Sequence, residues 1–540
     1  MKKYIDDLKY VLPLCILLLV SFTLTWAHQG HIILDCGREV YYPERILDGN
    51  VLYKDLFNIY GPFPYLYNAL LFKIFVIKLS TIYLSGIITA SGIITMIYLI
   101  SRLFFEKLMS FSITLLAIVI GCFSFYIFNY IFPYSFGMTY GLLACLVSLY
   151  FLILFVRNNI NSFLYLSTFF AGVAISNKYE FIPYCLIYLF LVFKNKLSVK
   201  TCVMSFLLLM FMPVLCFGIL FYQGLAITDL YHNFKDIYYM TKTDTLKFFY
   251  IISGLIFQNP TLGILIRNFL KAFASCSLIY AGMFYFCRFK IQSLIAIILG
   301  IFIAFKLISL ETFIFLPVLL FILFCLNFKK SSSDIILFSG AVLLVSLKVF
   351  WATAINSYGI FFIPVLIIAV LCFLNKEYYK TAIVYLLILT IGFAYFNYKE
   401  GKNKIIPVTS ERGVIYTYPV YDKTAQELVN YILKNTNKED KILILPEGLF
   451  FNFLTNRNSE DYYNSYLPLY IETFGESRLI KNIEQNKPDY IFIHNFPTSD
   501  YYFKSICKDY GFNVCNFINK EYSPKSLLLG DFTVYVFEQK

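Results

Sequence analysis

The stretch VLPLCILLLVSFTLTWA (Val11–Ala27) decides the fold class of this chain, because it is uncharged, predominantly apolar and long enough to cross a bilayer. A short charged start, MKKYIDD, precedes it, as in a secretory signal peptide. No small-residue cleavage site follows the apolar run, so we expect an uncleaved first transmembrane helix.

Similar apolar runs recur along most of the chain. Of the 540 residues, 59% are hydrophobic and only 14% are charged, whereas soluble proteins carry about 25% charged residues. We therefore predict a polytopic α-helical membrane protein with about thirteen transmembrane helices. The predicted spans lie near residues 10–27, 81–101, 108–128, 134–156, 162–176, 181–194, 201–221, 264–286, 291–309, 312–328, 334–350, 358–374 and 379–396.

The charge distribution predicts an orientation. The formal net charge is +12, and residues 397–540 contribute −1, which leaves +13 on residues 1–396. Every predicted inner loop is basic, which fits the positive-inside rule and argues against a nucleic-acid partner. Examples are Arg102, Lys107, Arg157, Arg288 and Lys376. We expect a protein of the bacterial plasma (inner) membrane with a cytoplasmic N-terminus, and an outer location for the first loop and for residues 397–540.

Residues 397–540 have the texture of a small extracytoplasmic α/β domain, and residues 1–396 form the predicted transmembrane domain. Short strand patterns occur at Lys441–Leu445, Asp489–His494 and Phe532–Phe537, and helical patterns at Lys423–Lys434 and Leu479–Lys487. Cys507 and Cys515 would pair only if this domain faces an oxidising space, and the sequence leaves that open.

The first outer loop, residues 28–80, concentrates acids and arginines near the membrane. It reads LDCGRE (Leu34–Glu39), LDGNVLYKD (Leu47–Asp55) and YGP (Tyr60–Pro62), with helical patterns at Glu39–Leu47 and Pro64–Leu79 that predict helices at the membrane surface. A carboxylate here can act as a general base, and a neighbouring arginine can bind a phosphate. The alternative is a solvated loop with surface ion pairs.

These motifs resemble the GT-C superfamily of membrane glycosyltransferases. The arrangement is similar to bacterial relatives of the protein O-mannosyltransferases and of the aminoarabinose transferase that modifies lipid A, that is, to glycosyltransferase family 39. The tail resembles theirs in Arg412-Gly413, in Leu445-Pro446-Glu447-Gly448, and in Asn452–Thr455 with Arg457.

The resemblance implies inverting transfer of a sugar from a polyprenyl-phosphate donor to a lipid, glycan or protein acceptor, with membrane lipids as surroundings. It places Asp35 as the catalytic base. The family often has Asp-Glu where this chain has Asp35-Cys36. This departure leaves two alternatives: Glu39 assists Asp35 in catalysis, or Asp55 is the second acid. No cofactor is required by the resemblance. We expect Glu447 and Arg457 to be structural parts of a loop, with no part in the chemistry. The location of residues 397–540 leaves a role in acceptor binding open.

Cations on the same predicted outer side are candidates for binding the donor phosphate. They are Arg38, Lys178 and Lys348, with Tyr60, Glu180 and Tyr358 as further site candidates. The alternative for both lysines is snorkelling at the membrane interface.

A divalent metal is a weaker prediction. His232 with Asp229 and Asp236 lies in the outer loop 222–263 and could hold one, although a solvated loop histidine is the more common case.

Other function classes have less support. A transporter or lipid-carrier flippase should show inverted repeats and charges near mid-membrane, and neither is visible. A non-catalytic binding protein would leave the acidic first loop unexplained. The chain has no GxxxxGK, HExxH or GxSxG motif, which argues against an ATP-driven pump, a zincin-type protease and a lipase.

Overall fold

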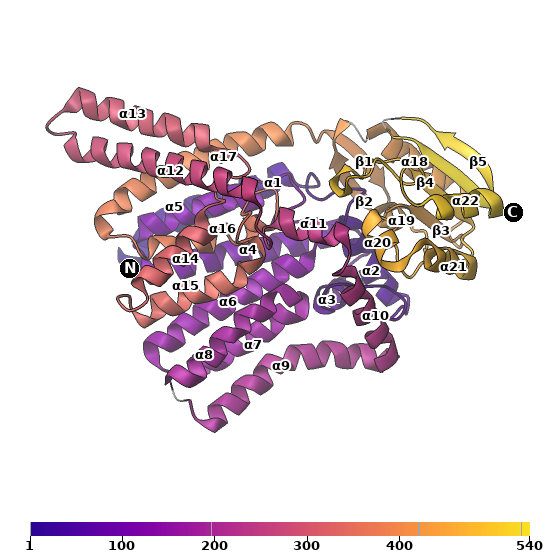
Figure 1. Ribbon diagram of the computed structural model, residues 1–540, viewed down its shortest axis with the longest axis horizontal. Coiled ribbons are helices and arrows are strands. Elements are labelled where there is room, and N and C mark those ends of the chain that lie inside the picture. Colours follow the sequence, from indigo (N-terminus) through magenta and orange to yellow (C-terminus); the bar gives the residue numbers. More distant parts are fainter. Residues whose placement is uncertain (1, 196, 420–421, 531) are drawn as a thin grey trace.

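The computed structural model describes residues 2–195, 197–419, 422–530 and 532–540. Met1, the first residue of the charged start, lies outside the described residues. Figure 1 shows the long helices on one side of the molecule and the strands on the other. Residues 402–540, here called the C-terminal region, contain the strands of the main sheet.

Each predicted spanning segment overlaps a helix. The helices are α1 (Lys2–Thr25), α4 (Leu79–Phe104), α5 (Lys107–Ala117), α6 (Phe136–Asn158), α7 (Asn161–Asn177), α8 (Leu186–Asn195), α9 (Val199–Tyr222), α12 (Asn259–Tyr285), α13 (Lys290–Leu307), α14 (Leu316–Asn327), α15 (Ser333–Val345), α16 (Ile363–Leu371) and α17 (Tyr379–Gly401). Within the described residues, 7 helices are long and apolar enough to cross a membrane. The chain is therefore an integral membrane protein, while the count of about thirteen spans stays a prediction.

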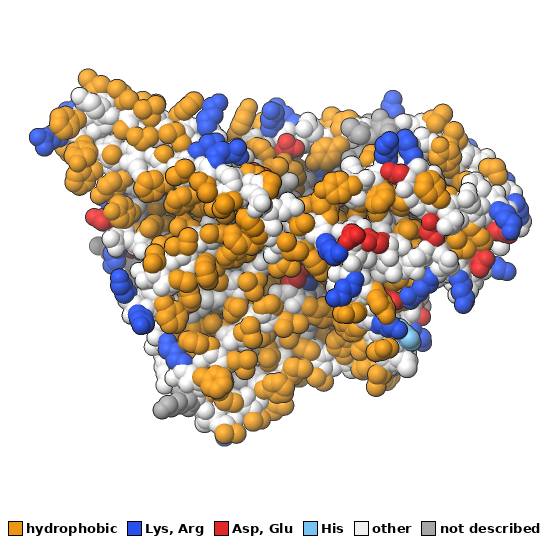
Figure 2. All heavy atoms as spheres, in the orientation of Figure 1, with side chains coloured by type: hydrophobic (Ala, Val, Ile, Leu, Met, Phe, Trp, Pro, Cys, Tyr) orange, Lys and Arg blue, Asp and Glu red, His pale blue; other side chains and the backbone are white. Residues whose placement is uncertain are grey.

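The surface of the helical part is suited to lipid. Side chains such as Val203, Phe206 and Leu207 on α9 and Leu294 and Ile298 on α13 are exposed, which water would penalise and hydrocarbon would not. Figure 2 shows apolar side chains over this part, with Lys and Arg along its left edge and mixed charges over the C-terminal region.

Four shorter helices belong to the predicted outer loops. They are α2 (Cys36–Leu47), α3 (Phe63–Ile74), α10 (Ile227–Met240) and α11 (Asp244–Ser253). The two helices predicted in the first loop are thus present. Every residue of α2 from Cys36 to Ile46 is buried within the protein, with α3 and α19 (Leu449–Thr455) packed against it. Its expected position at the membrane surface stays a prediction. The sequence could not reveal this cover, because α19 comes from the distant C-terminal region.

The C-terminal region contains a mixed four-stranded sheet in the order β3-β4-β6-β5. Strands β3 (Ile442–Leu445) and β4 (Tyr490–His494) are parallel, and β6 (Val534–Gln539) runs antiparallel to β4 and to β5 (Tyr522–Leu528). All four residues of β3 are buried, which suits a continuous apolar run in a parallel pair. The three predicted strand sites are confirmed, whereas β5 and the hairpin of β1 (Ile406–Ser410) and β2 (Gly413–Thr417) were not predicted.

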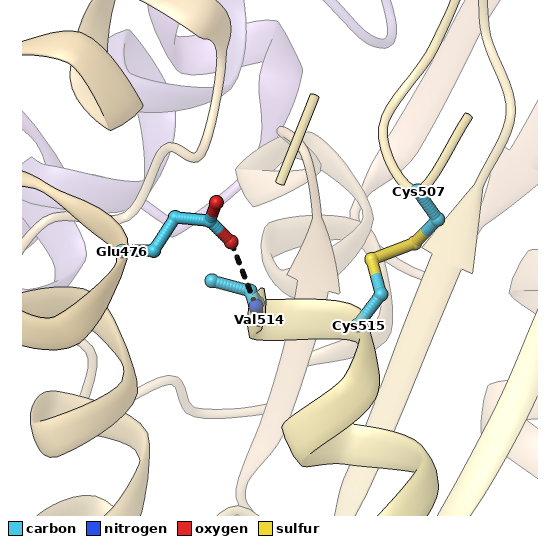
Figure 3. Close-up of a disulfide and its surroundings, with 4 residues drawn as sticks. All are labelled: Glu476, Cys507, Val514 and Cys515. Carbon is cyan, nitrogen blue, oxygen red and sulfur yellow. Dashed lines mark hydrogen bonds between the residues drawn. A yellow bond between two sulfur atoms is a disulfide. The ribbon is translucent and has the colours of Figure 1, made fainter. Parts of the chain in front are cut away.

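Helices connect and cover these strands. They are α18 (Asp422–Asn435), α19, α20 (Pro468–Phe474), α21 (Glu476–Asn486) and α22 (Phe512–Glu521). The parallel pair β3 and β4 needs a crossover connection, and α19, α20 and α21 lie within it. Cys507 and Cys515 form a disulfide that ties the preceding loop to the first turns of α22 (Figure 3). Beside it, the Glu476 carboxylate accepts a hydrogen bond from the Val514 N–H at 2.8 Å, which satisfies a free donor at the start of that helix.

Buried and bidentate contacts hold the C-terminal region against the first outer loop and α10. The two terminal nitrogens of Arg412 each donate to the Glu44 carboxylate at 2.6 Å. Arg478 makes a similar fork with Asp236 on α10, at 2.9 and 2.7 Å. These contacts place the end of β3 beside the start of α2, where the site candidates lie.

Candidate active site

Asp35 lies directly before α2 in an unusual backbone conformation. Its φ is 50° and its ψ is −48°, a region that residues with a side chain rarely adopt. The Asp35 N–H donates to Oε1 of Glu447 at 3.1 Å, and the Asp35 carbonyl accepts from the Arg38 N–H at 3.2 Å. The side chain keeps 42% of its surface exposed. The backbone is therefore held in place while the carboxylate remains accessible, a combination common at functional sites.

Glu39 is committed to structure. Its side chain is fully buried and accepts hydrogen bonds from Arg38 Nε at 3.3 Å, from the Tyr65 hydroxyl at 3.2 Å and from the Phe136 N–H at 2.7 Å. Both carboxylate oxygens are therefore occupied. The geometry therefore favours a role for Glu39 in orienting Arg38 over direct contact with a substrate.

Arg38 presents an unsatisfied donor beside Asp35. Its Nη2 is 3.8 Å from Asp35 Oδ1, too long for a hydrogen bond, and this buried nitrogen has no hydrogen-bond partner among the described residues. Buried guanidinium N–H groups without a partner are rare, because leaving them unpaired costs free energy. Arg38 is thus poised to donate to an anion that lies next to the Asp35 carboxylate.

Lys178 and Lys348 share one carboxylate. Glu180 Oε1 lies 3.2 Å from Lys178 Nζ and 2.6 Å from Lys348 Nζ. Lys178 follows α7, and burial lowers its pKa to about 7 although Glu180 attracts its proton. Burial would raise the pKa of Glu180, but the two lysines outweigh it and hold that pKa at about 2. The cluster carries more positive than negative charge when Lys178 is protonated, which suits an anionic ligand.

Two tyrosine rings join these cations to Arg38. The guanidinium of Arg38 and the ammonium of Lys178 each lie 4.7 Å from the centre of the Tyr60 ring. The Tyr358 ring lies 3.5 Å from Lys348 Nζ and 5.2 Å from Lys178 Nζ. Cations held over ring faces are stabilised by the ring quadrupole. Residues from three distant parts of the sequence therefore converge on one site.

Asp55 has a local contact of its own. Its Oδ2 accepts the Val51 N–H at 2.7 Å, which closes the turn of its loop. The acid that the structure brings next to Asp35 is Glu447, which the sequence had suggested was only part of a loop. Burial raises the pKa of Glu447 to about 8, and the negative charge of Asp35 adds to the rise. Burial also raises the pKa of Asp35, against the opposing positive charges of Arg38 and Lys178, so the two neighbouring carboxyl groups favour holding one proton between them.

Glu447 had one sequence signal that could have identified it. It follows the buried strand β3 by two residues, and ligands in α/β sheets bind beyond the carboxyl ends of parallel strands. Arg457, in contrast, fits the structural interpretation. Its guanidinium donates to the Thr436 hydroxyl and carbonyl at 2.8 and 2.7 Å and to the Thr455 carbonyl at 2.8 Å.

The two acids considered for a metal have other partners. Asp236 pairs with Arg478, and Asp229 accepts the Ala226 N–H at 2.9 Å as part of the α10 N-terminus. Within the described residues, His, Cys, Asp and Glu do not gather in any group of three or more that could hold a metal ion.

An apolar cavity of about 660 Å³ is lined by the residues on either side of Lys348 in the sequence. Leu347 and Phe350 line it together with Trp351, and residues of α8, α14 and α15 form most of the rest. Its lining is almost entirely apolar, whereas the adjacent cluster is cationic. An amphipathic lipid with an anionic head group would match both parts.

Comparison with known proteins gives a likeness of fold. No family model and no curated protein matches the sequence. The structure resembles the Archaeoglobus fulgidus oligosaccharyltransferase, solved with Zn and sulfate, with a TM-score of 0.51 and 12% identity over 97% of this chain and 73% of that chain. ArnT from Cupriavidus metallidurans bound to undecaprenyl phosphate gives a TM-score of 0.48 and 11% identity over 98% of both chains. The chain has a fold like that of the GT-C membrane glycosyltransferases, as the sequence motifs predicted.

Proposed function

We propose that this protein is an inverting glycosyltransferase that moves a sugar from a polyprenyl-phosphate donor to an acceptor on the outer face of the membrane. The observation that carries the proposal is the unpaired Nη2 of Arg38, buried 3.8 Å from the accessible Asp35 carboxylate. An anion-binding donor next to a candidate base is the arrangement that displacement of a phosphate requires.

The donor fits the two parts of the site. Its phosphate lies among Arg38, Lys178 and Lys348, which neutralise the charge that grows as the phosphate leaves. Its apolar chain lies in the cavity bounded by Leu347, Phe350 and Trp351. A phosphate leaving group that is stabilised by cations needs no general acid.

The reaction then needs one base. The acceptor hydroxyl oxygen attacks the anomeric carbon from the face opposite the phosphate, the bond between that carbon and the phosphate oxygen breaks, and the hydroxyl proton passes to Asp35. The products are the glycosylated acceptor and a polyprenyl phosphate. In this proposal Glu39 orients Arg38. The rings of Tyr60 and Tyr358 hold the three cations in place, and Asp55 takes no part in the reaction.

The proposed orientation puts this site and the C-terminal region outside the cytoplasm. The basic predicted inner loops and the N-terminus would then face the cytoplasm of a bacterial cell. The disulfide Cys507–Cys515 supports this orientation, since disulfides persist in oxidising compartments.

Replacing Asp35 by Asn tests the proposal. Membranes containing the full chain are supplied with a panel of polyprenyl-phosphate-linked hexoses and pentoses, and transfer of labelled sugar to endogenous acceptors is followed. We expect Asp35→Asn to lower the rate at least about 100-fold, since it removes a positioned base. Asp55→Asn is the matched control and should retain activity. Full transfer by Asp35→Asn would exclude the base assignment.

A further inference from the structure

A second cavity lies beside Asp35, between the first loop and the C-terminal region. It has a volume of about 410 Å³ and is lined by His31, Ile33 and Leu34 of the first loop, by Pro446 and Glu447, and by residues between His494 and Tyr501. Leu34 is the neighbour of Asp35, and Glu447 accepts the Asp35 N–H. The described lining contains none of the cations assigned to the donor phosphate. This cavity therefore lies next to Asp35 and apart from the cations assigned to the donor phosphate.

Uncharged histidines give this cavity a neutral polar wall. His494 Nε2 donates to the Glu447 carbonyl at 2.8 Å, and burial lowers the pKa of His494 to about 4. His31 Nδ1 accepts the N–H groups of Ile33 and Leu34 at 3.2 and 3.1 Å. Burial, with Lys404 nearby, lowers the pKa of His31 to about 3. Both histidines are thus neutral at physiological pH. His494 holds the backbone at Glu447, and His31 holds the backbone at Ile33 and Leu34.

A larger cavity adjoins this one. Its volume is about 880 Å³, and it shares His494, Pro497 and Ser499 with the smaller cavity. It lies entirely in the C-terminal region, and the disulfide cysteines Cys507 and Cys515 form part of its wall. The disulfide holds the loop that carries Lys504 and Lys508 close to α22 (Figure 3). The cavity is therefore a bounded space that continues the approach to Glu447.

The lining of the larger cavity has the chemistry of a saccharide site. Tyr502 and Tyr535 present rings that are 78% and 47% exposed, and flat rings of this kind pack against the apolar faces of sugars. Asn495, Asn519, Ser499 and Ser505 supply groups that bond sugar hydroxyls. Lys504 and Lys508 line it as well, and its described lining contains no Asp or Glu. That imbalance favours a ligand that carries negative charge.

We propose that the two cavities together form the acceptor site and that the acceptor is an anionic saccharide. Its charged groups lie near Lys504 and Lys508, its sugar rings pack on Tyr502 and Tyr535, and its reacting hydroxyl reaches Asp35 past Glu447. Glu447 is a positioning residue that holds the Asp35 backbone. The inference rests on the proposed function and adds the chemical class of the acceptor.

Binding of defined saccharides to the purified full-length protein in detergent tests the inference. The probes are hexagalacturonate, phosphorylated maltohexaose and neutral maltohexaose, and the method is isothermal titration calorimetry. We expect at least one of the two anionic probes to bind more tightly than the neutral probe. Whichever anionic probe binds more tightly distinguishes carboxylate-bearing from phosphate-bearing acceptors.

A double variant tests the two lysines. Lys504→Gln with Lys508→Gln should weaken binding of the preferred anionic probe about tenfold, since two solvent-exposed cations are lost, and should leave neutral maltohexaose unaffected. The matched control replaces Lys434 and Lys481, which are exposed lysines on α18 and α21 outside both cavities, by Gln. The control should bind all probes as the wild type does.

Ser499→Trp tests the cavities independently of charge, because Ser499 lines both and an indole would fill the space that they share. This variant should lose saccharide binding and still bind polyprenyl phosphate. Equal affinity for anionic and neutral probes, or unchanged binding by both the lysine double variant and Ser499→Trp, would overturn the inference. Absence of polyprenyl-phosphate binding from the wild type would instead overturn the proposed function, so the two failures are distinguished by separate measurements.

Discussion

The charge state of Lys178 should control how donor binding depends on pH. Its side chain is only 2% exposed, and burial lowers its pKa to about 7 despite the nearby Glu180 carboxylate. The free protein therefore carries the Lys178 ammonium in only part of its molecules near neutral pH. A bound phosphate favours the protonated, positively charged form of Lys178. As the pH rises, more protein molecules must therefore take up a proton from solution when polyprenyl phosphate binds.

The size of the effect follows from that pKa. The charged fraction of Lys178 is about one half at pH 7, about one tenth at pH 8 and about one hundredth at pH 9. The phosphate monoester has its second pKa near 6, so it stays a dianion over this range. If only protein molecules with a protonated Lys178 bind the phosphate, the Kd for polyprenyl phosphate should rise about fivefold from pH 7 to pH 8 and about tenfold more by pH 9.

Titration of polyprenyl phosphate into the purified protein between pH 6.5 and pH 9 measures this dependence, with polyprenol as the uncharged control. Lys178→Arg should flatten the profile, because a guanidinium stays protonated throughout. Lys348→Arg is the matched control and should keep the wild-type slope. Thermal unfolding confirms that each variant is folded. A wild-type Kd that is constant from pH 7 to pH 9, or a Lys178→Arg profile as steep as that of the wild type, would refute the reasoning.

Two further predictions concern how the C-terminal region is held. Arg412→Ala removes a guanidinium that is 13% exposed from the Glu44 carboxylate and should cost about 3–5 kcal/mol. Arg478→Ala leaves Asp236, 9% exposed, unpaired, but the Arg478 side chain is 47% exposed and its ion pair is screened by solvent, so the loss should be smaller, about 1–2 kcal/mol. Thermal unfolding compares them, and equal losses would contradict the burial argument. Glu447→Gln should gain stability relative to the wild type as the pH rises from about 4.5 to about 8, because the raised pKa makes ionisation of Glu447 unfavourable to folding in that window. Melting temperatures at pH 5, 7 and 9 measure this, and a difference that stays constant would contradict it.

Local pattern was enough to predict most of the secondary structure. Apolar length predicted where the long helices lie, since a helix satisfies its own backbone hydrogen bonds in lipid. KILIL and DYIFIH predicted β3 and β4 because short apolar runs suit a buried sheet. The edge strand β5 was missed, since its sequence YSPKSLL has a proline and little apolar alternation.

The candidate site was only partly predictable. The short stretch from Asp35 to Glu39 carried a recognisable motif, and isolated lysines near helix ends were visible as Lys178 and Lys348. That Tyr60 lies against both Arg38 and Lys178 is a contact between segments more than 100 residues apart. Glu447 was placed in a loop for the same reason, since its neighbour Asp35 is 412 positions away.

The sequence by itself determined that the chain lies in a membrane, where its helices run, and which acidic segment follows the first of them. These properties depend on the composition and spacing of neighbouring residues. Tertiary structure alone decided that α2 is buried, that Glu447 holds Asp35, and that Arg38 keeps an unpaired donor beside it. Those properties depend on packing between segments that are distant in the sequence. The free energy of such packing is a sum over contacts throughout the fold, so it leaves no pattern among neighbouring residues.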